Sequence, residues 1–158
     1  RLQQADNVAI YLANDGELDP MPIIKMLWRE GKNVYLPVLH PFCAGNLLFL
    51  HYQPDTSMVI NKYGMGQPKL DVRQVCPVEN LDVIFTPLVA FDDQCNRMGM
   101  GGGYYDRTLS VRHKRRLPYA IGLAHDCQQV DALPTEAWDI PMPEIVTPSR
   151  IFRQSDTK

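Results

Sequence analysis

Short apolar runs alternate with turn residues and amphipathic stretches along the chain, a pattern that predicts alternating strands and helices. Residues 7–12 (NVAIYL) form a β-branched apolar run that predicts a buried strand. Apolar residues then recur at helical spacing over 23–28, with Asp19 as the predicted N-cap and Gly31 as a left-handed cap at the other end. Residues 33–38 (NVYLPV) predict the next strand. Because a helix joins these two strands, we expect them to be parallel with a right-handed crossover.

The remaining apolar runs continue this alternation. The polar stretch 61–77 contains glycine and proline and predicts a long loop, and residues 104–116 predict a helix. The turn at 44–46 is expected to pair the strand that follows it with the strand before it. Further strands are predicted at 47–52, 81–85, 119–124 and 145–146. The sequence therefore predicts one α/β domain over residues 1–158.

Composition and charge narrow the class of protein. The 158 residues carry a net charge of −2, and 45% of them are hydrophobic, which is ordinary for a folded domain. No apolar run approaches the ~18 residues that cross a bilayer. The near-neutral charge argues against a nucleic-acid coat protein, although the basic run 112–116 keeps open a non-catalytic nucleotide- or RNA-binding module. Basic residues at a helix C-terminus complement the helix dipole, and this is the favoured interpretation of that run. We expect a cytoplasmic monomer that binds neither membrane nor nucleic acid.

The cysteines do not form a recognisable metal or disulfide pattern. The four are widely separated in the sequence, without a C-x-x-C pair. Free thiols in a reducing compartment are therefore expected. Cys95 lies next to the glycine-rich segment and is a candidate nucleophile, but a neutral loop thiol is the favoured interpretation.

A glycine-rich segment concentrates the candidate chemistry. Four of the ten glycines fall within five positions, at Gly99, Gly101, Gly102 and Gly103, after a predicted buried strand and before a predicted helix. Glycines let backbone amides converge on an anion, and a helix N-terminus favours phosphate. Arg97 and Arg107 can chelate phosphate oxygens, and Asp106 can hold a divalent cation. The spacing fits neither the Walker A motif nor the dinucleotide-binding fingerprint. It predicts a nucleotide-phosphate site of a less common kind.

The segment 97–107 (RMGMGGGYYDR), preceded by 87–92 (PLVAFD), resembles the signature of the 5-formyltetrahydrofolate cyclo-ligase family, also called methenyltetrahydrofolate synthetases. The resemblance continues through 16–19, 31–37, 67–68 and 133–139. It implies a three-layer α/β/α sandwich with a mainly parallel sheet, Rossmann-like and related to the sugar-phosphate isomerase and CoA-transferase type. It also implies a ligase that uses ATP and Mg²⁺ to cyclise 5-formyltetrahydrofolate to 5,10-methenyltetrahydrofolate. An isomerase or CoA-transferase-like enzyme of similar architecture is a further alternative.

The resemblance implies a role for each residue of the site. Tyr105, near the formyl group, and Arg97, on the phosphates, are the expected catalytic residues. Asp106 and Asp139 are the expected Mg²⁺ ligands. The expected substrate contacts are Leu12, Glu17, Met100, Gly101, Gly102, Gly103 and Tyr104. The expected ATP cradle is Arg97, Met98, Gly99, Met100, Gly101, Gly102, Gly103, Tyr104 and Tyr105.

Several of these residues also have ordinary structural interpretations. Without the resemblance, Glu17 is a turn acid, Asp139 a cap and Leu12 a core residue, and the two tyrosines pack a helix. The pair His125–Asp126 at a predicted strand end is a further active-site candidate. Family members also begin with a Lys- and Arg-rich helix that contacts ATP, and the chain starts at Arg1 almost directly on its first strand. We therefore expect the working enzyme to be longer than 158 residues.

Overall fold

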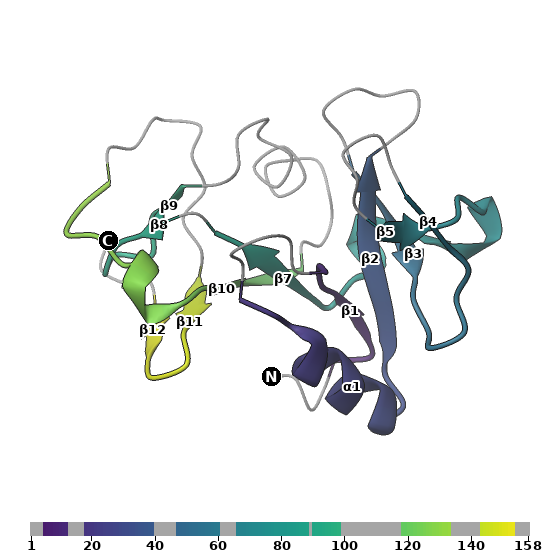
Figure 1. Ribbon diagram of the computed structural model, residues 1–158, viewed down its shortest axis with the longest axis horizontal. Coiled ribbons are helices and arrows are strands. Elements are labelled where there is room, and N and C mark those ends of the chain that lie inside the picture. The colour runs from purple at the N-terminus through teal and green to yellow at the C-terminus, as the bar shows by residue number, and fades with distance from the viewer. Residues whose placement is uncertain are drawn as a thin grey trace.

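A computed structural model describes residues 5–12, 18–39, 47–60, 66–88, 90–98, 118–133 and 143–153. An eight-stranded sheet with the order β12-β11-β10-β7-β1-β2-β3-β6 organises these residues (Figure 1). The strands are β1 (Asn7–Ala9), β2 (Asn33–Leu39), β3 (Leu47–His51), β6 (Val75–Cys76), β7 (Val83–Pro87), β10 (Tyr119–Leu123), β11 (Glu144–Val146) and β12 (Ile151–Arg153).

The centre of the sheet is parallel and its two edges are antiparallel. The four parallel pairs join β2 to β1, β1 to β7, β7 to β10 and β10 to β11. The edge strands β3, β6 and β12 pair in the antiparallel sense. The predicted parallel β-α-β opening is confirmed, and so is the pairing of β3 with β2.

Both faces of the central strands are buried. Along β7, Val83 and Phe85 belong to a core cluster that includes the helix α1 (Met21–Arg29), whereas Ile84 belongs to a second cluster with Phe91 and Ile145. Successive strand residues point to opposite faces, so these two clusters cover the two sides of the sheet. Figure 1 shows α1 beside β1 and β2. The mainly parallel α/β class is confirmed, while the predicted helix 104–116 lies outside the described residues.

The start of α1 differs by one residue from the prediction. Pro20 is the N-cap, and Asp19 precedes it. The Asp19 carboxylate still accepts a hydrogen bond from the Met21 amide at 3.0 Å, so it satisfies one of the free amides of the first turn. The Asp19 side chain therefore caps the start of the helix from the residue before the N-cap.

The end of α1 is the left-handed cap that the sequence predicts. Gly31 has a φ of +76°. Its amide donates to the Trp28 carbonyl at 3.0 Å, and the Lys32 amide donates to the Leu27 carbonyl at 3.0 Å. These two bonds are the Schellman pattern, in which a left-handed residue after the helix lets two amides close the last turn.

The prediction of a long loop over 61–77 is wrong. The strands β4 (Met58–Ile60) and β5 (Gly66–Pro68) form an antiparallel hairpin, and β6 pairs with β3 through Cys76 and Phe49. Short 3₁₀ turns, η2 (Val72–Gln74) and η3 (Val78–Asn80), separate these strands. Short edge strands with glycine and proline have little intrinsic propensity, so pairing with a neighbour decides their conformation.

Some strand limits also differ from the predicted ones. The first strand ends at Ala9, and β7 begins at Val83, two residues later than predicted. None of the sequence patterns predicts β12, β8 (Ala90–Phe91) or β9 (Arg97–Met98). In the part of the chain that the structure describes, no helix has the length and apolar character needed to span a membrane.

Candidate active site

The strand order reverses direction between β1 and β7. From β1 the chain continues to β2 on one side, whereas β7, β10 and β11 follow one another on the other side. In open α/β sheets such a reversal leaves a crevice beyond the carboxyl ends of the two strands, where ligands bind. The residues at this edge are 10–12 after β1 and Thr86 to Leu88 at the end of β7. The topology therefore places the candidate site here.

A short hairpin carries the chain from this edge to the glycine-rich segment. Strands β8 and β9 pair antiparallel, with Phe91 opposite Arg97, and Met98 is the last described residue before Gly99. Phe91 is fully buried, and its ring meets that of Phe152 edge to face with centroids 5.1 Å apart. The hairpin is thus anchored in the core at the point where the predicted phosphate cradle begins.

The turn of this hairpin is built around the carboxylate of Asp92. Its Oδ1 accepts hydrogen bonds from the backbone amides of Gln94 at 3.0 Å and Asn96 at 3.1 Å. Its Oδ2 accepts from Asn96 Nδ2 at 3.1 Å and from the Leu133 amide at 3.0 Å. Asp92 is 2% exposed, and the acceptor positions of a buried carboxylate must be filled in this way for its charge to be tolerated.

Burial and hydrogen bonding act in opposite directions on this carboxyl group. Burial raises the pKa of Asp92, but the hydrogen bonds from Leu133, Asn96 and Gln94 outweigh it and hold the pKa below its ordinary value. The side chain is therefore an anion at neutral pH, and each of its two oxygens accepts two hydrogen bonds.

A second chain segment flanks the hairpin. Phe91 bridges to Gln129 in the parallel sense, and the Val130 amide donates to the Phe91 carbonyl at 2.8 Å. With the Leu133 contact to Asp92, these interactions tie residues 129–133 along β8. We call residues 129–133 the strap. It ends immediately before the segment that contains Asp139.

Cys95 is a buried structural residue of the same turn. It is fully buried and has a φ of +63°. Its amide donates to the Asp92 carbonyl at 3.1 Å, which closes the turn. Burial, followed by the charge of Asp92, raises the pKa of the Cys95 thiol to about 11. This supports the neutral-thiol interpretation over the nucleophile, and the other described cysteines, Cys76 and Cys127, are also free thiols.

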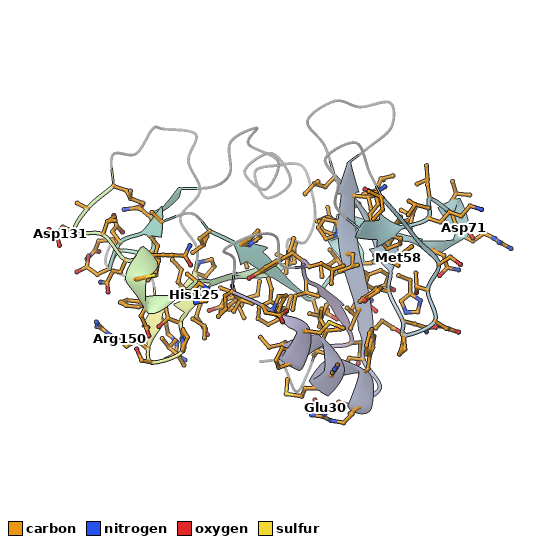
Figure 2. The ribbon with its side chains drawn as sticks, in the orientation of Figure 1. Glu30, Met58, Asp71, His125, Asp131 and Arg150 are labelled. Atoms are coloured by element: carbon orange, nitrogen blue, oxygen red, sulfur yellow. The ribbon has the colours of Figure 1, made fainter. Side chains whose placement is uncertain are left out.

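The pair His125–Asp126 has a structural role at the end of β10. The Asp126 carboxylate accepts a hydrogen bond from Ser149 Oγ at 2.7 Å, and hydrogen bonds from Thr147 and then Ser149 lower its pKa. The pair begins the 3₁₀ turn η4 (Asp126–Gln128). These contacts join η4 to the loop between β11 and β12, which Figure 2 shows as the neighbourhood of the labelled His125 and Arg150.

Gln128 is a residue whose part in this arrangement the sequence did not reveal. Its Nε2 donates to the Leu88 carbonyl at 2.6 Å, and its Oε1 accepts from the His125 amide at 2.6 Å. It therefore connects the end of β10 to the end of β7. For Asp92, by contrast, a signal existed, because an Asp followed two and four residues later by hydrogen-bonding partners is a common turn former.

Three of the predicted site residues lie in the described part of the chain. Leu12 follows β1 and is half-buried against the core cluster that includes α1, which agrees with its interpretation as a core residue. Arg97 and Met98 form β9. The other predicted residues lie outside the described residues: Glu17, Gly99, Met100, Gly101, Gly102, Gly103, Tyr104, Tyr105, Asp106 and Asp139. Within the described ranges, no three metal-ligating side chains of His, Cys, Asp or Glu gather together.

A polar hollow of about 660 Å³ lies elsewhere, beside the β4–β5 hairpin. His51 lines it, and His51 pairs with Tyr35 in the amino-terminal half of β2. The hollow therefore lies toward the amino-terminal end of β2, away from the edge where β1 and β7 end. Its other lining residues include Gln53, Thr56, Lys69 and Gln74.

Known proteins are similar to this chain in sequence and in fold. The chain is 58% identical over 149 residues to the 5-formyltetrahydrofolate cyclo-ligase of Escherichia coli (strain K12), covering 94% of this chain and 81% of that protein. It is 54% identical over 145 residues to the Haemophilus influenzae protein of the same name, covering 91% of this chain and 76% of that protein.

A solved structure agrees with the sequence relatives. The NMR structure of Aquifex aeolicus 5,10-methenyltetrahydrofolate synthetase superposes with a TM-score of 0.79 and 30% identity, covering 99% of this chain and 75% of that one. The sequence model of the 5-formyltetrahydrofolate cyclo-ligase family matches residues 1–148. On these grounds, the chain belongs to the 5-formyltetrahydrofolate cyclo-ligase family.

Proposed function

We propose that this protein catalyses the ATP-dependent cyclisation of 5-formyltetrahydrofolate to 5,10-methenyltetrahydrofolate. The observation that carries the proposal is the match of the family model to residues 1–148, together with 58% identity to the Escherichia coli cyclo-ligase. The position of the β8–β9 hairpin supports it, because this hairpin follows the end of β7 at the carboxyl edge of a parallel sheet, where phosphate ligands bind, and precedes the glycine-rich segment in the sequence.

The reaction explains why ATP is needed. The formamide carbonyl of the substrate is stabilised by resonance, and its oxygen is a poor leaving group. Transfer of the γ-phosphoryl group forms an O–P bond to the formyl oxygen and breaks the P–O bond to ADP. The neighbouring folate amine then attacks the formyl carbon, loses its proton, and phosphate leaves with the C–O bonding electrons. The protein has to align the phosphoryl group with the formyl oxygen and stabilise negative charge.

The chain supplies groups for each of these tasks. In the proposal, the amides of the glycine-rich segment and the guanidinium of Arg97 bind the phosphates, and the Tyr105 hydroxyl lies near the formyl group. Leu12 and Glu17 contact the folate, with the Glu17 carboxylate as an acceptor for its N–H groups. Phosphoryl transfer of this kind needs alignment and charge stabilisation, so no protein nucleophile is required. The buried, neutral thiol of Cys95 is consistent with that.

In the proposal, two carboxylates hold a magnesium ion. Mg²⁺ is bound in proteins by one or two carboxylates together with substrate phosphates, and Asp106 and Asp139 are donors of that type. When bound, the ion would neutralise charge on the transferred phosphoryl group. Asp106 and Asp139 are thus the proposed metal ligands, and residues of the glycine-rich segment make the substrate contacts other than those of Leu12 and Glu17.

The activity is tested by following the absorbance of methenyltetrahydrofolate. The full-length protein is incubated with 5-formyltetrahydrofolate and MgATP together, and with each alone. We expect product only when both are present, with one ADP released for each product. Product formed without ATP, or no product with both substrates, would disprove the proposed function. Sedimentation of the same sample with and without the substrates tests the proposed monomer.

Asp106→Asn tests the metal assignment. We expect the Mg²⁺ concentration for half-maximal activity to rise by at least about tenfold, because even an outer partner of a metal site is worth that much. Asp93→Asn is the matched control, since Asp93 is exposed on the β8–β9 turn and has no assigned role. An unchanged Mg²⁺ dependence in Asp106→Asn would refute the assignment.

A further inference from the structure

One buried carboxylate joins two segments that lead to different parts of the proposed site. Asp92 accepts two amides of its own hairpin turn through Oδ1 and the Leu133 amide of the strap through Oδ2. The hairpin continues into the glycine-rich segment after Met98, and the strap continues into residues 134–139. Leu133 is 41 residues away from Asp92 in the sequence, so this contact is a tertiary one.

The chemistry of the contact makes it sensitive to geometry. Three of the four donors on Asp92 are backbone amides, which cannot rotate away as side chains do. The carboxylate is 2% exposed, so water cannot readily replace a lost donor. Charge-assisted bonds to a buried anion are also stronger than neutral ones. The hairpin and the strap are therefore held in one fixed register.

We propose that Asp92 is a positioning residue for MgATP: by joining the β8–β9 hairpin to the strap, it fixes the position of β9, and with it the backbone of Arg97, for phosphate binding. This inference rests on the proposed function, because Arg97 is a phosphate-binding residue only in that proposal. Asp92 itself touches backbone and the Asn96 side chain in the described structure. It acts through the segments it joins.

Asp92→Asn breaks one side of this link and spares the other. The amide oxygen can remain where Oδ1 is and accept from Gln94 and Asn96. The new NH₂ group then lies at the Oδ2 position and faces the Leu133 amide. Both groups are hydrogen-bond donors, so the bond to Leu133 is lost. The Asn96 side chain can turn its own amide to restore a bond, but the backbone of Leu133 cannot.

Asn96→Ala is the matched control. It removes the Asn96 Nδ2 bond to the same Oδ2 atom and leaves the Leu133 bond in place. Both variants thus remove a hydrogen bond from one carboxylate, yet only Asp92→Asn separates the strap. Thermal unfolding of both variants verifies that each is folded at the assay temperature.

The central measurement is a calorimetric titration of MgATP into the folate-free protein. We expect Asp92→Asn to weaken MgATP binding by about tenfold, as removal of an outer partner of a metal site does, and Asn96→Ala by less than twofold. In turnover assays, kcat of Asp92→Asn falls while the KM for 5-formyltetrahydrofolate changes less than twofold, because the hairpin bonds that precede the folate contacts remain. Equal effects of the two variants on MgATP binding would overturn the inference.

Hydrogen exchange on the unmodified protein provides a second test that needs no variant. If the two segments are registered on one ligand, MgATP should slow amide exchange both in residues 92–98 and in the strap. Slower exchange in residues 92–98 alone would contradict the proposal. These readouts do not need folate turnover, so a protein that binds MgATP in this way but forms no product would refute the proposed function and leave the positioning role standing.

Discussion

Two small hairpins that pair outside the main sheet, β4–β5 and β8–β9, lie at opposite ends of it and are held in different ways (Figure 1). The β8–β9 hairpin inserts Phe91 and Cys95 into the core and folds its turn around the buried carboxylate of Asp92. In the β4–β5 hairpin, every residue of β4 is exposed, and Ile60 is 72% exposed. Figure 2 shows Met58 and Asp71 at that end of the molecule, far from Asp131 in the strap.

The difference shows that backbone pairing alone does not determine how closely a hairpin is packed against the rest of the fold. Backbone pairing defines both hairpins, but β8–β9 adds the fully buried side chains of Phe91 and Cys95 and hydrogen bonds to the strap, whereas β4 is exposed throughout. Segments with few buried contacts and exposed backbone bonds open at low free-energy cost. The hairpin that leads to the glycine-rich segment is thus the one whose position is fixed by the rest of the fold.

The largest contrast is expected from removing an apolar side chain in each hairpin. Phe91→Ala should destabilise the protein by about 3–5 kcal/mol, because it empties a fully buried site against Phe152. Ile60→Ala should change stability by less than about 0.5 kcal/mol, since that side chain is already in water. Urea unfolding measures both. Similar losses for the two variants would show that the hairpins are equally integrated.

A smaller contrast is expected from adding a methyl group. A Cβ at Gly122 in β10 would lie 3.0 Å from Leu88 Cδ1 and 3.2 Å from an Ile145 carbon, so Gly122→Ala should cost about 1–3 kcal/mol. At Gly66 in β5 the nearest atom is Met58 Cε at 3.9 Å. Gly66→Ala should therefore be neutral or stabilise by up to about 1 kcal/mol through the unfolded state. Melting temperatures compare the two, and a destabilised Gly66→Ala would mean that β5 is packed more tightly than it is here.

The smallest contrast is in the pH dependence of stability. Burial raises the pKa of Asp92, but its hydrogen bonds outweigh this and hold the pKa below the ordinary 3.8. The unfolded state then binds the proton more readily, so the stabilisation is present above pH about 4 and is lost as pH falls through the lower, folded pKa. In Asp92→Asn, the free energy of unfolding should therefore fall less steeply with decreasing pH than in the unmodified protein.

Asp71 is the control for this measurement. The hydrogen bond from the Arg73 side chain lowers the pKa of Asp71 as well, but the pair is exposed. Exposed ion pairs contribute little to stability, so Asp71→Asn should follow the unmodified protein between pH 5 and 2 to within experimental error. Unfolding in urea at a series of pH values gives both curves. If Asp71→Asn flattened the curve as much as Asp92→Asn, the buried network would not be the source of the acid sensitivity.

The sequence predicted the parts of the fold whose signals are local. The apolar runs located β1, β2, β3, β7, β10 and β11 to within a few residues, and Gly31 marked the end of α1 because a left-handed cap favours glycine. The strands β4, β5, β6, β8, β9 and β12 escaped prediction. Each is two or three residues long, so no periodicity can accumulate within it.

For the candidate site, the sequence revealed the glycine-rich motif but not the tertiary hydrogen bonds around the hairpin that precedes it. The glycine-rich segment and its flanking Arg97 were recognisable because residues of one chemistry fall close together in the chain. Asp92 was visible within the same motif, yet its bond to Leu133 depends on a chain segment 41 residues away. Gln128 escaped notice for the same reason, since its partner Leu88 lies 40 residues away.

By itself, then, the sequence determined the α/β class, the parallel order of the first two strands and the family, because apolar period, cap chemistry and a contiguous motif are properties of neighbouring residues. Only the tertiary structure decided which short strands pair, that Cys95 is a buried thiol, and that Asp92 binds the hairpin to the strap. These features depend on which distant donors and side chains the fold brings to one place, and a buried carboxylate or thiol takes its properties from those neighbours.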